Sequence, residues 1–416
     1  MDDKVKYLLS LQAVRERASL VGEAAKAGKL THFDVHEDKL GEAADYVTGV
    51  IKHFEVGNIP RITTLLDAWK ENGCDELETT RRLIDLFFVS VLLDAGAGDF
   101  WKYVERGTES GVYERSEGIA VASLWMFREG VFAEGGGMVV DGKGLSNLQT
   151  STLAHGFQIS DTNPMLGIES RASLLRSLGK SLLSQLHIFG KEGRPGNVVD
   201  YMKTTTTTTT LDILTFWDIL QNLLIPIWPQ DRTVVACQAL GDAWPLSTLK
   251  TVSSATSTTT DETAHIQPFH KLTQWLAYSL TVPFSRILGL TWKNTDALTA
   301  LPEYRNGGLF VDLGVLTLKS EALTRGLAAA SSTTGGSSKL PTFSAGDDVI
   351  VEWRAMTLVL VDKLYKLVLE RMEGVELSMA QLLEAGTWKA GREVAKAKRP
   401  QTKSSPIVIE SDGTVF

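Results

Sequence analysis

Apolar residues recur at helical spacing through most of the first half of the chain. The segment 5–26 begins with apolar residues and continues as an alanine-rich stretch dotted with charges. The segment 62–69 repeats the pattern after Pro60, a residue that suits the first turn of a helix. The segment 82–94 is apolar nearly all round, which predicts a buried helix.

The helical pattern continues towards the C-terminus, and strand patterns are rare. Asp99 is expected to cap a short helix that carries Phe100, Trp101 and Tyr103. Longer helices are expected at 117–132, 174–189, 349–372 and 379–398. A short strand is expected in the glycine-rich segment 134–144, and the alternating residues 407–416 resemble a docked strand. The predicted fold is therefore mainly α, a multi-helix globular fold with few short strands.

Three low-complexity segments interrupt these helices. They are the threonine run 204–210, the Ser/Thr tract 251–260 and the segment 329–346. Such compositions offer little material for a core, so we expect exposed loops rather than domain linkers. Residues 1–416 are accordingly predicted to form one large helical unit. Its N-terminal helical part would cover about 1–200, and a site-bearing C-terminal part would cover about 211–416.

Composition places the chain among ordinary globular proteins, and we expect a cytoplasmic location. It is 43% hydrophobic and 22% charged. The net charge of -8 gives no reason to expect binding to nucleic acid or to a membrane surface. Cys74 and Cys237 are too few for a disulfide framework, and no apolar run is long enough to span a bilayer. The expected partner is a small molecule, and the sequence does not indicate an oligomeric state.

The common catalytic signatures are absent from the sequence. There is no G-x-S-x-G serine elbow, and neither cysteine lies beside a basic or histidine-bearing motif. His32 and His36 are four residues apart, but they lack the glutamate of the His-Glu-x-x-His zinc motif. No metal and no organic cofactor are therefore expected.

Polar residues instead cluster at the entrances of strongly apolar helices in the region 240–360. Trp244 lies in a polar turn, and Glu303, Tyr304 and Arg305 separate two apolar stretches. The other members of the group are His270, Lys271, Gln274, Glu352 and Arg354. Helix caps and surface ion pairs explain such residues as well as a shared cleft does. Spacing alone leaves these two interpretations equally open.

A resemblance to a known family bears on this choice. The chain resembles, nearly end to end, a fungal and bacterial family of proteins of unknown function that is linked to uracil catabolism through ribosylurea. The segments that carry the resemblance are VSVLLDAGAGDFWKY at 89–103, SEGIAVASLWMF at 116–127, RPGNVVDY at 194–201, GDAWPLS at 241–247, PFHKLTQWLAYSL at 268–280, LPEYRNGGLFVDLGVL at 301–316, VEWRAMTLVLVDKL at 351–364 and SDGTVF at 411–416. The threonine-rich segments depart from the family pattern.

A more distant likeness suggests the chemistry. The segments FHKLTQ, LPEYR and VEWRA are similar in order and spacing to segments of the queuosine-nucleotide N-glycosidases, which are helical proteins related to DNA glycosylases. In that family the position matched by Glu303 is an aspartate that serves as the catalytic carboxylate, and the lysine matched by Lys271 lies in the substrate pocket. The glutamate of this chain reaches one methylene further than the aspartate.

The resemblance implies a hydrolase that breaks an N-ribosyl bond. Glu303 would stabilise the positive charge that develops on the sugar or activate a water. Lys271 and Arg305 would bind a 5'-phosphate, and Gln274, Tyr304 or His270 would donate to the leaving group. Trp101 and Trp244 would form walls of the pocket. Glu352 and Arg354 would support the other site residues or form a structural ion pair.

The leading hypothesis from the sequence is an N-ribohydrolase of uracil catabolism that releases urea from ribosylurea or its 5'-phosphate. One alternative is a metal-dependent hydrolase of the same pathway that opens or deaminates the pyrimidine ring. The other is a non-catalytic protein that binds a nucleotide or a pathway partner.

Overall fold

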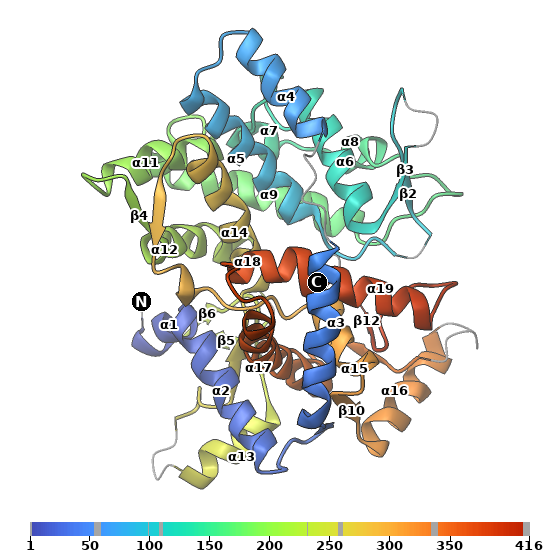
Figure 1. Ribbon diagram of the computed structural model, residues 1–416. Coiled ribbons are helices and arrows are strands. Elements are labelled where there is room, and N and C mark those ends of the chain that lie inside the picture. The colour runs from blue at the N-terminus through green and yellow to red at the C-terminus, as the bar shows by residue number, and fades with distance from the viewer. Residues whose placement is uncertain are drawn as a thin grey trace. The chain divides into compact units, whose positions relative to one another are not determined.

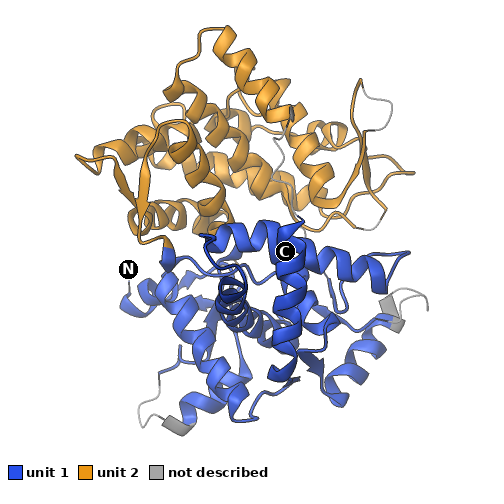
Figure 2. Ribbon diagram, viewed as in Figure 1, with its two compact units in different colours: residues 1–55, 231–271, 296–410 blue, residues 56–230, 272–295, 411–416 orange. Residues whose placement is uncertain are grey.

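The computed structural model describes residues 2–53, 60–98, 100–107, 111–230, 232–256, 261–333 and 340–410. The chain divides into two compact units, each made of separate stretches of sequence (Figure 2). The first unit contains 1–55, 231–271 and 296–410, and the second contains 56–230, 272–295 and 411–416. The predicted C-terminal part, residues 211–416, is thus shared between the two units. The fold is mainly α, as predicted.

The first unit is built around the long helix α17, Asp348–Arg371 (Figure 1). Its other helices are α1 (Asp3–Leu8), α2 (Leu11–Lys26), α3 (Leu40–Lys52), α13 (Ser247–Thr256), α15 (Tyr304–Asp312), α16 (Ser320–Thr333), α18 (Met379–Gln381) and α19 (Trp388–Lys398). Helix α17 packs against α2, α3 and α15, and α15 packs against α19. Because α17 is covered on several sides, its N-terminal two thirds is almost wholly buried.

Short strand pairs join the helices of the first unit. Strand β1 (Phe33–Val35) pairs antiparallel with β10 (Leu316–Leu318), and β7 (Ala243–Pro245) pairs antiparallel with β8 (Ile266–Pro268). Strands β5 (Val234–Val235) and β6 (Gln238–Ala239) form a small hairpin. Strand β12 (Val408–Glu410) pairs in parallel with β11 (Thr342–Ser344). The predicted C-terminal strand is thus confirmed at 408–410, while 411–416 lie outside the described residues.

The second unit is a set of helices with two strand pairs. Its helices are α4 (Pro60–Glu71), α5 (Glu76–Leu93), α6 (Arg115–Arg128), α7 (Gly142–Ser146), α8 (Thr150–Gly156), α9 (Ile168–Ser184), α10 (Leu186–Phe189), α11 (Val198–Thr204), α12 (Ile213–Leu224) and most of α14 (Lys271–Arg286). Helix α9 lies among α5, α7, α8 and α12. Strands β2 (Lys102–Val104) and β3 (Val112–Glu114) pair antiparallel, and β4 (Thr210–Asp212) pairs in parallel with β9 (Thr291–Lys293).

The helix predicted around Phe100, Trp101 and Tyr103 is wrong. Residues 102–104 form strand β2, in which Tyr103 is buried while its neighbours face solvent. Alternation between exposed and buried side chains is typical of a half-buried strand, but over three residues it is too short to be recognised in the sequence. The proposed cap, Asp99, lies outside the described residues.

Several predicted boundaries also change. The segment 5–26 is two helices, because Ser10 accepts a hydrogen bond from the Ala13 N–H and starts α2. No strand forms among residues 134–144, where Asp141 caps α7 instead. Two of the tracts expected to be loops begin as helix, since 251–256 belong to α13 and 329–333 belong to α16. Residues 257–260 and 334–339 lie outside the described residues.

No helix of the described ranges combines the length and the apolar composition that crossing a bilayer requires.

Close backbone contact between α15 and α19 leads to a prediction about Gly391. A Cβ at Gly391 would lie 2.4 Å from the carbonyl oxygen of Arg305, which is backbone and cannot rotate away. We expect Gly391→Ala to lower the free energy of unfolding by about 1–3 kcal/mol, because α19 must shift to relieve the clash. A Cβ at Gly49 of α3 meets nothing within 4 Å. Gly49→Ala should therefore stabilise the protein by about 0.5–1 kcal/mol. Urea unfolding of both variants measures the two changes in the free energy of unfolding. If Gly391→Ala and Gly49→Ala changed it equally, the packing argument would be contradicted.

Candidate functional site

Glu303 is the residue that caps helix α15. Its Oε2 accepts a hydrogen bond from the Arg305 N–H at 2.8 Å, and its Oε1 accepts one from the Asn306 N–H at 2.5 Å. A carboxylate is favourable at this place because the first N–H groups of a helix have no partner inside the helix and carry a partial positive charge. The side chain is only 8% exposed. The carboxylate is therefore held rigidly by backbone groups, away from bulk solvent.

The environment of Glu303 perturbs its ionisation. Burial raises the pKa of Glu303, while the Arg305 N–H, the charges of Arg305 and Lys271, and the Asn306 N–H lower it. Burial outweighs the other contributions, so the pKa lies above that of an ordinary glutamate. The charge of Lys271 acts on this carboxylate although the two residues are 32 positions apart along the chain. A buried carboxyl group with a raised pKa near a lysine is a common feature of sites that transfer protons.

Lys271 is the first residue of α14 and is only 4% exposed. The chain turns into this helix at His270, whose φ of 46° is uncommon for a residue with a side chain. The His270 ring lies 2.8 Å from the carbonyl oxygen of Leu8 through Nε2. Since a carbonyl only accepts, Nε2 must carry the hydrogen. Burial lowers the pKa of His270, so the ring is neutral at physiological pH.

Asp242 lies at the centre of this region, although the sequence analysis did not select it as a site residue. Its Oδ2 accepts the Lys271 N–H at 3.0 Å, and its Oδ1 accepts the indole N–H of Trp244 at 2.8 Å. Both oxygens also accept from the guanidinium of Arg354, each at 2.8 Å. Burial alone would raise the pKa of Asp242, but the charge of Arg354 and these hydrogen bonds hold it well below the usual range. The aspartate is therefore ionised.

Arg354 lies on α17 and is 2% exposed. Besides its fork to Asp242, its Nε donates to the carbonyl oxygen of Pro302 at 3.1 Å, next to Glu303. The guanidinium carbon lies 4.0 Å from the centroid of the Phe269 ring. Arg354 is therefore half of a buried ion pair, and its partner is Asp242 rather than Glu352.

Glu352 has a different task, although it is two residues from Arg354. It is fully buried and its oxygens accept the backbone N–H groups of Thr31 at 2.8 Å, His32 at 2.7 Å and Phe33 at 3.1 Å. The hydroxyl of Thr248 also donates to it. Glu352 thus ties the segment before β1 to the start of α13 and to α17.

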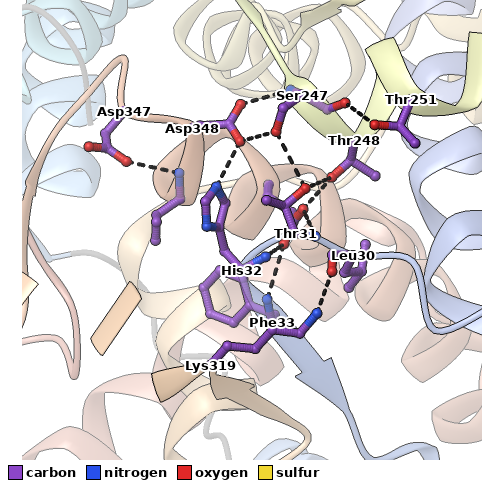
Figure 3. Close-up of polar contacts among 12 residues, drawn as sticks. Leu30, Thr31, His32, Phe33, Ser247, Thr248, Thr251, Lys319, Asp347 and Asp348 are labelled. Atoms are coloured by element: carbon purple, nitrogen blue, oxygen red, sulfur yellow. Dashed lines mark hydrogen bonds and ion pairs between the residues drawn. The ribbon is translucent and has the colours of Figure 1, made fainter. Parts of the chain in front are cut away.

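Further polar contacts hold the same segment, as Figure 3 shows. The His32 ring lies 2.7 Å from Asp348 Oδ2 through Nε2, and the Ser247 N–H donates to Asp348 Oδ1 at 2.8 Å. Lys319 donates to the carbonyl oxygen of Leu30. His32 therefore takes part in a polar network around the start of α17. Across the part of the chain that the structure describes, no group of three or more His, Cys, Asp or Glu residues is placed to hold a metal.

The guanidinium of Arg305 lies over two aromatic rings. Its guanidinium carbon is 4.3 Å from the centroid of the Trp388 ring and 5.4 Å from that of Tyr304. Its Nε also donates to the Tyr304 hydroxyl at 3.2 Å. Trp388 follows the π-helical turn Leu382–Thr387, and sequence reasoning did not single it out. Turns of this kind are rare and occur frequently at functional sites.

Two of the predicted site residues belong to the second unit. Gln274 is fully buried, one turn after Lys271 along α14. Trp101 is also buried; its indole N–H donates to the carbonyl oxygen of Phe157 at 2.8 Å, and its ring packs edge-on against that of Phe157. The remaining predicted residues all belong to the first unit, namely Trp244, His270, Lys271, Glu303, Tyr304, Arg305, Glu352 and Arg354.

Comparison with known proteins places the chain in a family. It is 46% identical over 437 residues to the protein urg3 of Schizosaccharomyces pombe, covering 100% of this chain and 99% of the relative. It is 42% identical over 442 residues to uracil catabolism protein 4 of Lachancea kluyveri, covering 100% of both chains. The family model described as protein of unknown function (DUF1688) matches residues 7–416. The chain therefore belongs to the DUF1688 family.

Proposed function

We propose that this protein is an N-ribohydrolase of uracil catabolism, which hydrolyses the bond between ribose and urea in ribosylurea or its 5'-phosphate. The link to uracil catabolism is supported by the name of the Lachancea kluyveri relative. The reaction type is supported above all by Glu303, a buried carboxyl group fixed by two backbone N–H groups and subject to the charge of Lys271.

Glu303 would act on the sugar. When the bond from C1' to nitrogen breaks, positive charge develops on C1' and the ring oxygen, and an ionised carboxylate stabilises it or accepts a proton from the attacking water. Each oxygen of Glu303 accepts one backbone N–H and retains further lone-pair capacity for a water. In a low-dielectric environment this stabilisation is stronger than in bulk water.

Tyr304 is the better candidate for the proton donor to urea. The hydroxyl of Tyr304 accepts from Arg305 Nε, which leaves its own O–H to donate to the leaving group. His270 is less suited, because its Nε2 hydrogen already faces the Leu8 carbonyl and its ring is neutral. Lys271 and Arg305 would hold a 5'-phosphate, with a point charge and a planar fork respectively. The guanidinium of Arg354 binds Asp242 and the carbonyl oxygen of Pro302.

The direct test is to incubate the purified protein with ribosylurea and, separately, with its 5'-phosphate. Release of urea together with ribose or ribose phosphate supports the proposal. No turnover of either compound by protein with an intact circular dichroism spectrum would remove it. Turnover of a pyrimidine-ring compound in place of ribosylurea, by protein that contains stoichiometric zinc or iron, would instead favour the metal-dependent hydrolase.

The raised pKa of Glu303 predicts the pH dependence of this activity. The reaction needs the ionised carboxylate, so kcat/KM, which reports ionisation in the free protein, should fall as the pH drops through the pKa of Glu303. Because burial raises that pKa, the acid limb should lie at a higher pH than the pKa of an ordinary glutamate, about 4.3. Measuring kcat/KM for urea release between about pH 4 and pH 8 checks this. An activity that stays constant down to the range of an ordinary glutamate would contradict it.

A further inference from the structure

We propose that Asp242 is a positioning residue, which holds Lys271 and Glu303 in a fixed geometry through its ion pair with Arg354. This inference rests on the proposed function, since it assigns Lys271 and Glu303 to one reaction. Asp242 itself is not proposed to touch the substrate.

Asp242 determines where the chain enters α14. It lies in the turn that precedes β7, and the pairing of Ala243 with Pro268 brings the end of β8 alongside it. The carbonyl oxygen of Asp242 accepts the N–H groups of Phe269 at 2.9 Å and His270 at 3.1 Å. Its side chain accepts the next N–H, that of Lys271. One residue thus receives three consecutive N–H groups and fixes the backbone that carries the lysine.

Arg354 extends this control to the other half of the site. Its two terminal nitrogens bind the oxygens of Asp242, and its Nε binds the carbonyl oxygen of Pro302, the residue before Glu303. The connection from the Lys271 N–H through Asp242 and Arg354 to Pro302 consists of hydrogen bonds of 2.8 to 3.1 Å. Segments that are distant in sequence are therefore held together by one planar fork, which restrains both distance and orientation.

The buried ion pair of Asp242 and Arg354 is better explained as a restraint on the positions of Lys271 and Glu303 than as a contribution to folding stability. Buried pairs gain little net stability over apolar residues of the same size, because both charges lose their hydration. Catalysis, in contrast, depends strongly on position, and a displacement of about 1 Å can cost roughly 100-fold in rate. An ion pair that joins the backbone under Lys271 to the backbone under Glu303 supplies that restraint.

The test compares two double variants that each remove a buried arginine–aspartate fork. Asp242→Asn/Arg354→Met removes the proposed positioning pair without leaving a buried charge. Asp312→Asn/Arg399→Met is the control, since Arg399 binds both oxygens of Asp312 at the opposite end of α15. For each protein two quantities are measured: kcat for urea release, and the rate at which an amine-acylating reagent labels Lys271, with the exposed Lys29 as internal reference.

We expect Asp242→Asn/Arg354→Met to remain folded, to lose about 100-fold in kcat, and to label at Lys271 much faster than the parent protein. The control should keep both the parent kcat and the protection of Lys271. If Lys271 stays protected and kcat is unchanged in the first variant, Asp242 is only structural and the proposal is overturned. If the parent protein releases no urea, the proposed function fails, while the labelling still decides whether Asp242 holds Lys271 in place. Should the double variant not fold, Arg354→Lys takes its place with the same two measurements, because lysine keeps the charge opposite Asp242 but cannot form the planar fork.

Discussion

Glu303→Gln is expected to lower kcat for urea release by about 100- to 10,000-fold, the usual contribution of a positioned general base. Glutamine has nearly the same shape but carries no charge, so it neither stabilises the developing positive charge nor accepts the proton of water. Its amide oxygen can still accept one of the two N–H groups that Glu303 now accepts. The loss of folding stability should therefore be limited to about 1–2 kcal/mol, the value of a helix cap. Steady-state kinetics and thermal unfolding measure the two effects separately.

A matched control separates catalysis from capping. Asp141 caps α7 and, like Glu303, accepts two backbone N–H groups, from Glu134 at 2.9 Å and Gly144 at 2.7 Å. Asp141→Asn should lose a similar amount of stability and retain full turnover. If Glu303→Gln also retains turnover, the carboxylate is only a cap. The interpretation as a non-catalytic binding protein would then gain support.

Arg354→Met is expected to lower the free energy of unfolding by about 3–5 kcal/mol, because it leaves the buried carboxylate of Asp242 without its counter-charge. This is the largest stability effect that we expect from a single substitution in the region. Adding Asp242→Asn to Arg354→Met should recover a large part of the loss, since the unpaired charge then disappears. Chemical denaturation of both single variants and of the double variant gives the coupling energy. A loss below about 1 kcal/mol, typical of an exposed pair, would contradict the description of this pair as buried.

The pH dependence of stability should also change in Arg354→Met. In the parent protein the folded pKa of Asp242 lies below the unfolded value of about 3.9. Its stabilising contribution is thus fully present above that pH and declines as the pH falls below it. Without Arg354, burial dominates and the folded pKa should exceed the unfolded one. The variant should therefore gain stability relative to the parent as the pH is lowered through about 4.

The helices were largely predictable from the sequence because their evidence is local. The apolar faces of α5 and α17 extend over many residues, and the start of α4 is marked in the sequence by Pro60, its first residue. Strand β2 was not predictable in this way. It has only three residues, and it depends on a partner strand and on the side chains of Asn163 and Gln158, which bond to its backbone. Short elements of this kind are defined by contacts that no local pattern contains.

The same contrast applies to the candidate site. The polar cluster that contains Glu303 was conspicuous between two apolar stretches, but only the resemblance to the N-glycosidases selected Glu303 as the catalytic carboxylate. Asp242 was not selected, because its importance depends on Arg354, which is 112 residues away. Glu352 likewise seemed to belong with Arg354, whereas the three backbone N–H groups that it accepts lie about 320 residues earlier in the chain. Polar residues could thus be selected by their type, but their pairing required the tertiary structure.

The measurement that tests the central claim most directly is the identity of the broken bond. Ribosylurea labelled with carbon-13 at the urea carbonyl and at C1' of ribose can be followed by nuclear magnetic resonance in the presence of the protein. We predict that intact labelled urea and labelled ribose appear in equal amounts, and that with Glu303→Gln both form at least about 100-fold more slowly. Label that emerges as carbonate while C1' stays bonded to nitrogen, or equal turnover by the Glu303→Gln variant, would contradict the proposed role of Glu303.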